Sequence, residues 1–175
     1  MVRNNLYFLV KCKILNIEGK KIDVYEHFLA PIDGRLVAIE KVSDSVFAQK
    51  IMGDGFAIDP VNGEITSPVN GTVTSFMAET RHAVGITAED GMEVLIHIGI
   101  DTVNLGGEGF IGLVGQDDKV TAGQLLLRVD LELLRDKVPS LISTVVFINL
   151  PAGMSVTVEE GRLIKRGDKG FFTVG

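Results

Sequence analysis

The sequence predicts an all-β protein, an antiparallel β-sandwich or barrel. Short runs rich in β-branched residues are separated by glycine turns at about strand-length intervals, and the 175-residue chain contains 20 glycines. Four turn dipeptides that tolerate positive φ mark these boundaries: Asp54-Gly55, Asn62-Gly63, Asn70-Gly71 and Asp90-Gly91. Helical spacing of apolar residues is almost absent. Together these observations are typical of sandwiches and barrels.

A weak internal repeat supports the same fold class. Residues 30–37 match residues 67–74 at an offset of 37, and residues 54–58 match residues 90–94 at an offset of 36. Two copies are too few for a solenoid. The repeat therefore predicts a duplicated strand motif that closes one sandwich.

The N-terminal residues 1–29 lie outside this pattern and are predicted to be an extension or an extra edge element. Glu18-Gly19 is placed to turn a hairpin between two short β-rich runs, and His27 is interpreted as structural. Cys12, the only cysteine, has no partner for an internal disulfide and is interpreted as a thiol on the inner face of a strand. Residues 30–175 are predicted to form a single domain.

One short helix is predicted near residues 131–138. The segment Leu131–Val138 has helical apolar spacing, Asp130 before it is a suitable N-cap, and Pro139 follows its end. The rest of the chain is expected to be strands and turns.

Composition excludes two classes of partner. The net charge is −6 and no stretch concentrates Lys and Arg, so nucleic-acid binding is not expected. No apolar run approaches the roughly 20 residues of a membrane-spanning helix, so no membrane insertion is expected. The apolar run at residues 6–10 is too short for a signal-peptide core. A cytoplasmic location is therefore expected.

Two of the three histidines are predicted to share a site. His97 lies in an apolar, β-branched run and is followed at once by Gly99 and Asp101. His82 lies fifteen residues upstream, a separation that fits strand, turn, strand. The two rings are then able to face each other across neighbouring strands.

Facing imidazoles permit a metal site. Zinc normally takes three or four protein ligands, and the available set here is His82, His97 and Asp101. Residues four apart on a strand, such as His97 and Asp101, lie about 13 Å apart. Asp101 is therefore able to bind the same metal ion as His97 only if the strand ends between these two residues, which Gly99 allows. A zinc-dependent hydrolase or zinc-bridged binding module therefore remains the alternative. The His-x-His pair of zinc peptidases with similar sandwiches is missing.

Phosphoryl acceptance fits these residues better. An imidazole with an ordinary pKa near 6.5 is mostly neutral at pH 7 and is a good nucleophile. A loose phosphoryl transition state needs mainly positioning and charge stabilisation. In this interpretation His97 is the nucleophile, His82 stabilises the phosphoryl group and Thr80 orients His82. No cofactor is needed, and the chain has no nucleotide-binding glycine loop.

Several segments in one order resemble the enzyme IIA component of the glucose family of the bacterial sugar phosphotransferase system. The resemblance runs from about Ala30 to Leu150. The segments that carry it are Ala30-Pro31-Ile32-Asp33-Gly34, Val46-Phe47-Ala48-Gln49-Lys50-Ile51-Met52-Gly53-Asp54-Gly55, Thr80-Arg81-His82-Ala83, His97-Ile98-Gly99-Ile100-Asp101-Thr102-Val103 and Gly107-Glu108-Gly109-Phe110. The family's fold is an antiparallel β-sandwich with an internal duplication.

The resemblance implies a phosphocarrier. His97 would accept a phosphoryl group on Nε2 from the phosphocarrier protein HPr and pass it to a cysteine on the IIB domain of a sugar permease. His82 and Thr80 match the family's supporting pair, and the Gly99 carbonyl would accept a hydrogen bond from Nδ1–H of His97. Proteins of this family often also regulate metabolic enzymes by binding them when unphosphorylated. The residues that match its docking surface for partners are Val46, Phe47, Met52, Leu95, Val103 and the acidic Asp101.

Overall fold

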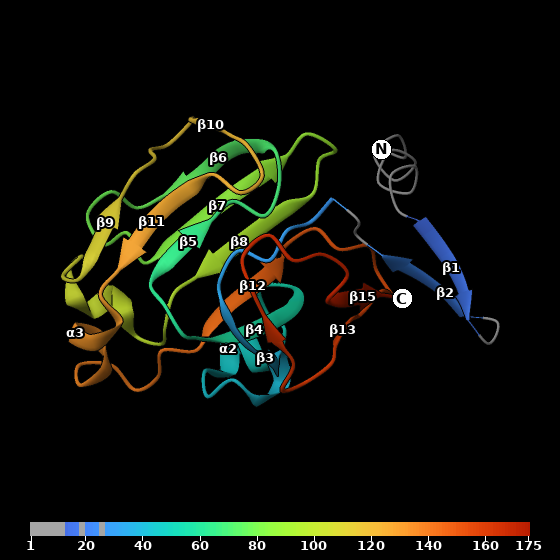
Figure 1. Ribbon diagram of the computed structural model, residues 1–175, viewed down its shortest axis with the longest axis horizontal. Helices are drawn as coiled ribbons and strands as arrows, with labels where there is room; N and C mark the ends of the chain where they lie inside the picture. Colours follow the sequence, from blue (N-terminus) through green and yellow to red (C-terminus); the bar gives the residue numbers. More distant parts are fainter. Residues whose placement is uncertain (1–12, 18–19, 25–26) are drawn as a thin grey trace.

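The computed structural model describes residues 13–17, 20–24 and 27–175, and its strands form three sheets with antiparallel pairing throughout (Figure 1). The largest sheet has the order β10 (Lys119–Val120), β6 (Gly71–Phe76), β7 (Ala83–Ala88), β8 (Glu93–His97), β12 (Ser143–Phe147), β4 (Asp54–Pro60), β3 (Gly34–Ala38) and β14 (Leu163–Ile164). A smaller sheet has the order β5 (Glu64–Thr66), β11 (Leu125–Val129) and β9 (Phe110–Gly112). The third contains β1 (Lys13–Ile17), β2 (Lys20–Val24), β15 (Phe172–Val174) and β13 (Val156–Val158).

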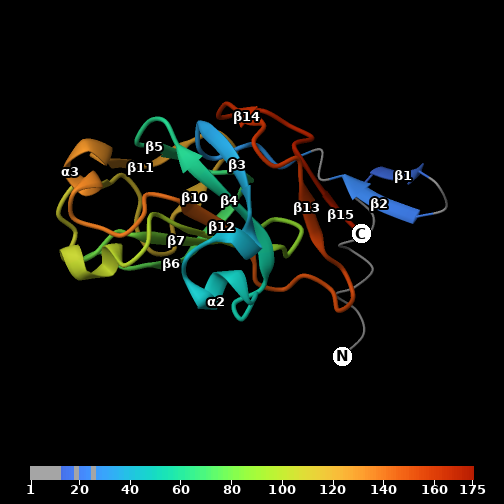
Figure 2. The same cartoon turned by 90° about the horizontal axis from the view of Figure 1, so that it is seen from below.

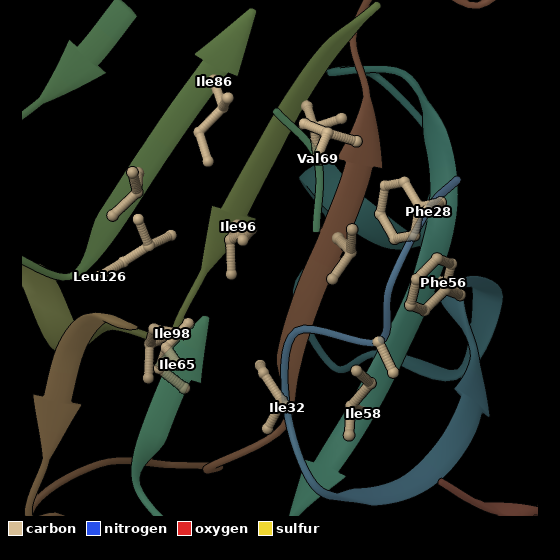
Figure 3. Packing of buried hydrophobic residues seen from close by; sticks show 14 of the residues in the cluster. Phe28, Ile32, Phe56, Ile58, Ile65, Val69, Ile86, Ile96, Ile98 and Leu126 are labelled. Atoms are coloured by element: carbon tan, nitrogen blue, oxygen red, sulfur yellow. The ribbon is translucent and has the colours of Figure 1, made fainter. Parts of the chain in front are cut away.

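The predicted sandwich is confirmed, and its main core lies between the sheets. The smaller sheet covers β6, β7 and β8, and the view from below separates the two layers (Figure 2). Leu126 of the smaller sheet lies beside Ile86 and Ile96 of the large sheet, and Ile65 of the smaller sheet lies beside Ile98 (Figure 3). The barrel form of the prediction is not found, because β10 and β14 lie at opposite ends of the large sheet's order and do not pair.

The two copies of the repeat lie at the start of two corresponding strands, β3 and β6. Each of these strands begins with a glycine. A Cβ at Gly34 would lie 2.2 Å from the Asp59 carbonyl oxygen, and one at Gly71 would lie 2.3 Å from the Thr87 carbonyl oxygen. Both strands therefore start where a neighbouring backbone leaves no room for a side chain. This shared requirement explains why the repeat is readable in the sequence.

The predicted helix exists but is shorter than expected. It is α3 (Leu131–Arg135), and the Asp130 side chain caps it by accepting from the Leu133 amide at 3.0 Å. After Arg135 the chain closes in a turn, in which the amides of Lys137 and Val138 both donate to the Leu134 carbonyl. No helix among the described residues is long and apolar enough to cross a membrane.

A second short helix was not predicted. α2 (Ser45–Ala48) is capped by the Asp44 side chain, which accepts from the Val46 amide at 2.7 Å. It follows the 3₁₀ turn η1 (Ile39–Lys41) and lies on the side of the large sheet away from β5 and β11 (Figure 2). A small apolar cluster lies under this region and consists of Ile39, Val42, Phe47, Ala57, Ile100 and Val146.

The N-terminal strands form a hairpin, and β2 meets β15 through the pair Asp23 and Val174 (Figure 1). The expected turn at Glu18-Gly19 and the expected strand thiol Cys12 lie outside the described residues. The division between residues 1–29 and residues 30–175 stays a prediction.

Candidate functional site

Two imidazoles meet on the outer face of the large sheet. Ile96 and Ile98 belong to the main core, so the alternation along β8 turns His97 outward. His97 pairs with Ala83 of β7, and the Ile98 amide donates to the His82 carbonyl at 2.8 Å. The ring centroids of His82 and His97 are 5.0 Å apart and the rings are nearly perpendicular, at 83°. The predicted approach of the two rings is confirmed.

His82 is held by its own loop. Its Nδ1 lies 2.8 Å from the Thr80 hydroxyl, and its side chain is buried. Arg81, which lies between Thr80 and His82, has a left-handed φ of 53°, and β7 begins just after this turn, at Ala83. When the Thr80 hydroxyl donates to Nδ1, the neutral ring carries its hydrogen on Nε2. His82 is then a hydrogen-bond donor towards the space beside His97.

The ring of His97 has one covered and one open nitrogen. Nδ1 is buried and has no hydrogen-bond partner of ordinary geometry among the described residues, whereas Nε2 is not among the buried, unpaired atoms. Phe47 from α2 packs against this ring, with 5.0 Å between centroids. The site therefore presents Nε2 of His97 to an incoming group and keeps Nδ1 inside.

Burial, with a smaller contribution from the neighbouring His82, lowers the pKa of His97 to about 4. The Gly99 backbone contact raises this pKa, but by less than burial lowers it. Burial also lowers the pKa of His82. Both rings are thus neutral at pH 7, and a neutral imidazole has the lone pair that a nucleophile needs.

We expect His97 to stay neutral well below pH 6 in the folded protein, and histidine NMR titration measures this directly. Its pKa is near 6.5 in the unfolded chain and about 4 when folded, so the unfolded chain binds the proton first. Stability should therefore fall as pH drops from 6.5 to 4, by roughly 3 kcal/mol from this residue. His97→Gln should reduce that dependence. A His97 midpoint near 6.5 would contradict the burial argument.

The loop after His97 is fixed by backbone contacts. The Ile100 amide donates to the Ser140 carbonyl at 2.8 Å, and the Thr102 hydroxyl donates to the Ile98 carbonyl at 2.6 Å. Gly99 has a φ of 67°, and its amide donates to the Ser143 hydroxyl at 3.3 Å. The chain then enters the 3₁₀ turn η2 (Thr102–Leu105).

Gly99→Ala is expected to destabilise the protein by about 2 kcal/mol or more. The left-handed backbone disfavours alanine, and the new Cβ would lie 2.7 Å from Thr102 Cγ2 and 3.1 Å from the Ser140 carbonyl oxygen. Gly106→Ala is the matched control, because Gly106 has a φ of 59° with nothing within 4 Å of its Cβ position. Urea unfolding compares the two. Equal losses would show that space at Gly99 is not limiting.

The predicted docking residues differ in exposure. Val46, Met52 and Val103 are exposed, at 37%, 41% and 45%, and Asp101 is also exposed. Leu95 is only partly exposed and packs on the small cluster under α2. Phe47 differs from the expectation of a surface residue, since it is 5% exposed and lies against His97.

The sequence interpretation missed three residues that belong to this region. Ile51 is 67% exposed and follows α2 next to Met52. The Asp44 carboxylate partly raises the pKa of His97, so it lies near enough to act on the ring. The sequence did contain a signal for Asp44, because an aspartate shortly before the apolar pair Val46 and Phe47 is a suitable N-cap for a short helix. Thr144 pairs with His97 across β12, which no local signal could reveal.

A metal centre has no support in this geometry. Within residues 13–17, 20–24 and 27–175, no three His, Cys, Asp or Glu side chains come together as a metal ion requires. The zinc alternative built on His82, His97 and Asp101 therefore gains nothing from the structure.

Comparison with known proteins gives consistent matches. The family model for the phosphoenolpyruvate-dependent sugar phosphotransferase system, EIIA 1, matches residues 26–153. A glucose-specific EIIA component from Staphylococcus epidermidis is 41% identical over 86% of this chain and 90% of its own length, and one from Staphylococcus aureus is 40% identical over the same shares. The solved glucose permease IIA of Mycoplasma capricolum has a TM-score of 0.76 and 40% identity, covering 83% of this chain and 93% of its own.

The fold and these matches define a phosphocarrier of the sugar phosphotransferase system, which is a phosphotransferase component by reaction. The chain belongs to the family of EIIA 1 components of the phosphoenolpyruvate-dependent sugar phosphotransferase system.

Proposed function

We propose that His97 carries the phosphoryl group on Nε2. The lone pair of Nε2 attacks phosphorus, and the electron pair of the breaking P–N bond returns to the histidine of phospho-HPr. In the second transfer a cysteine thiolate of a permease IIB domain attacks, and the P–N bond to His97 breaks. The observation that carries this proposal is the ring's arrangement: Nδ1 is buried, Nε2 is open and the pKa is lowered to about 4.

His82 and Thr80 are proposed to stabilise the transferring group. The His82 ring lies 5.0 Å from that of His97, and Thr80 holds its Nδ1 at 2.8 Å. With the hydrogen on Nε2, His82 donates to a phosphoryl oxygen as negative charge builds there. Preorganised donors of this kind act where charge develops and need no rearrangement during the reaction.

We propose that partner proteins bind to one docking surface. This surface consists of Val46, Met52, Leu95, Asp101 and Val103. Three of these apolar side chains are exposed, and exposed apolar groups often mark an interaction site. Asp101 supplies a negative charge for arginines on a partner. Phe47 supports the surface from below.

HPr and the IIB domain would use this surface in turn, so each complex must be small and short-lived. Regulatory targets of the unphosphorylated protein would compete for the same surface. This role implies a cytoplasmic location.

Labelled phosphoryl transfer tests the proposal. Phosphoenolpyruvate, enzyme I and HPr are mixed with the protein, and the product is tested in acid and in base. An acid-labile, base-stable label that requires HPr supports a phosphohistidine. An absent label together with stoichiometric zinc after purification would favour the metal-site alternative.

A further inference from the structure

Thr144 lies directly beside the proposed phosphoryl acceptor and has no role in the chemistry described so far. It pairs with His97 in the β8–β12 register, and its side chain is 0% exposed. Its Oγ1 is buried without a hydrogen-bond partner among the described residues. Only one other side-chain atom in that part of the chain has the same property, and it is Nδ1 of His97.

Two unpaired polar atoms on adjacent residues are costly. A buried donor or acceptor without a partner loses its hydration and gains nothing in return. The two strands that flank β8 offer His97 an alanine, Ala83, on one side and Thr144 on the other. Thr144 is therefore the register partner of His97 that offers a hydroxyl.

The distance between the two positions suits a direct contact. Directly opposed residues of antiparallel strands have Cβ atoms about 4.5–5.5 Å apart. Oγ1 is bonded to the Cβ of Thr144, and Nδ1 is two bonds from the Cβ of His97. The His97 ring is fixed by its packing against Phe47 and His82. Thr144 Oγ1 has no hydrogen-bond partner elsewhere among the described residues, so rotation about the χ1 bond of Thr144 is free to turn this hydroxyl towards the ring.

We propose that the Thr144 hydroxyl accepts a hydrogen bond from Nδ1–H of His97 and so positions this ring for phosphoryl transfer. The inference rests on the proposed function of His97. A hydrogen on Nδ1 leaves the lone pair on Nε2. When Nε2 bonds to phosphorus, the ring becomes an imidazolium that keeps its Nδ1–H, and an acceptor beside that hydrogen stabilises the product.

Thr144 adds to the contact from the Gly99 backbone. Each histidine of the site then has a threonine on its Nδ1, Thr80 for His82 and Thr144 for His97. Thr144 is a positioning residue, since it acts through His97.

The test uses nitrogen-15 NMR of histidine-labelled protein at pH 7, which reports the hydrogen on each ring nitrogen. Thr144→Val removes the hydroxyl and keeps a β-branched shape, and Thr144→Ser keeps the hydroxyl. Thr87→Val is the matched control, because Thr87 lies on β7 of the same sheet and its hydroxyl contacts that of Thr74. The equilibrium of phosphoryl transfer from phospho-HPr is measured on the same samples.

We expect Thr144→Val to lower the ratio of Nδ1–H to Nε2–H tautomers of His97 about fivefold, and the transfer equilibrium by a similar factor. Thr144→Ser and Thr87→Val should resemble the wild type. If Thr144→Val does not fold, Thr144→Ala removes the same hydroxyl and is judged by the same ratio.

An unchanged tautomer ratio in the variant that lacks the hydroxyl would overturn the inference, even if the wild type is phosphorylated. A wild type that takes up no phosphoryl group would instead overturn the proposed function, whatever the tautomer ratio.

Discussion

His97→Ala is expected to abolish phosphoryl uptake. The substitution removes the only ring at this site whose Nδ1 is buried and whose Nε2 is open. His82 cannot replace His97, because Nδ1 of His82 is hydrogen-bonded to the Thr80 hydroxyl. When that hydroxyl donates, Nε2 of His82 carries the ring hydrogen and has no lone pair available for attack. Incorporation of label from phospho-HPr measures the effect.

The matched control for this substitution is His27→Ala. His27 is an exposed histidine in a turn outside the site, and its loss should leave uptake unchanged. Thermal unfolding checks that both variants fold. Substantial label in folded His97→Ala protein would place the phosphoryl group on another residue.

The second large effect is expected from His82→Gln. This variant should still accept a phosphoryl group on His97, since the nucleophile itself is intact. Onward transfer to the IIB cysteine should fall by about 10²–10³-fold, as it does when a preorganised donor to developing charge is lost. A glutamine amide is flexible and lacks the fixed direction that Thr80 gives the imidazole. Single-turnover loss of label to a purified IIB domain measures this step.

Thr80→Val gives a graded comparison. It keeps the His82 ring and removes only the hydroxyl at 2.8 Å, so onward transfer should fall less than in His82→Gln. Onward transfer at the wild-type rate in His82→Gln would mean that this ring does not stabilise the transition state.

Local pattern was enough to predict the all-β fold class and the histidine pair. Glycines at Gly34 and Gly71 mark places where two backbones approach too closely for a side chain, so the physical constraint is written in the sequence. His82 directly precedes β7 and His97 ends β8. These consecutive strands are joined by a turn, and such strands pair with a register that their spacing nearly sets. It was therefore predictable that the two rings meet, and the structure places their centroids 5.0 Å apart.

Long-range packing decided what the sequence interpretation missed. Thr144 meets His97 only because β12 pairs with β8, and strand order in a sheet is not a local property. Phe47 belongs to a one-turn helix, too short for apolar periodicity to reveal, and its burial depends on the sheet below. The choice between barrel and sandwich likewise depended on whether the outermost strands pair.

The most direct test of the central claim is phosphorus-31 and nitrogen-15 NMR of protein that carries labelled histidine and has been phosphorylated through HPr. One-bond phosphorus–nitrogen coupling identifies the nitrogen that is bonded to phosphorus. The account predicts a coupling to Nε2 of His97, with the hydrogen retained on Nδ1. Coupling to Nδ1 of His97, or to either nitrogen of His82, would contradict it.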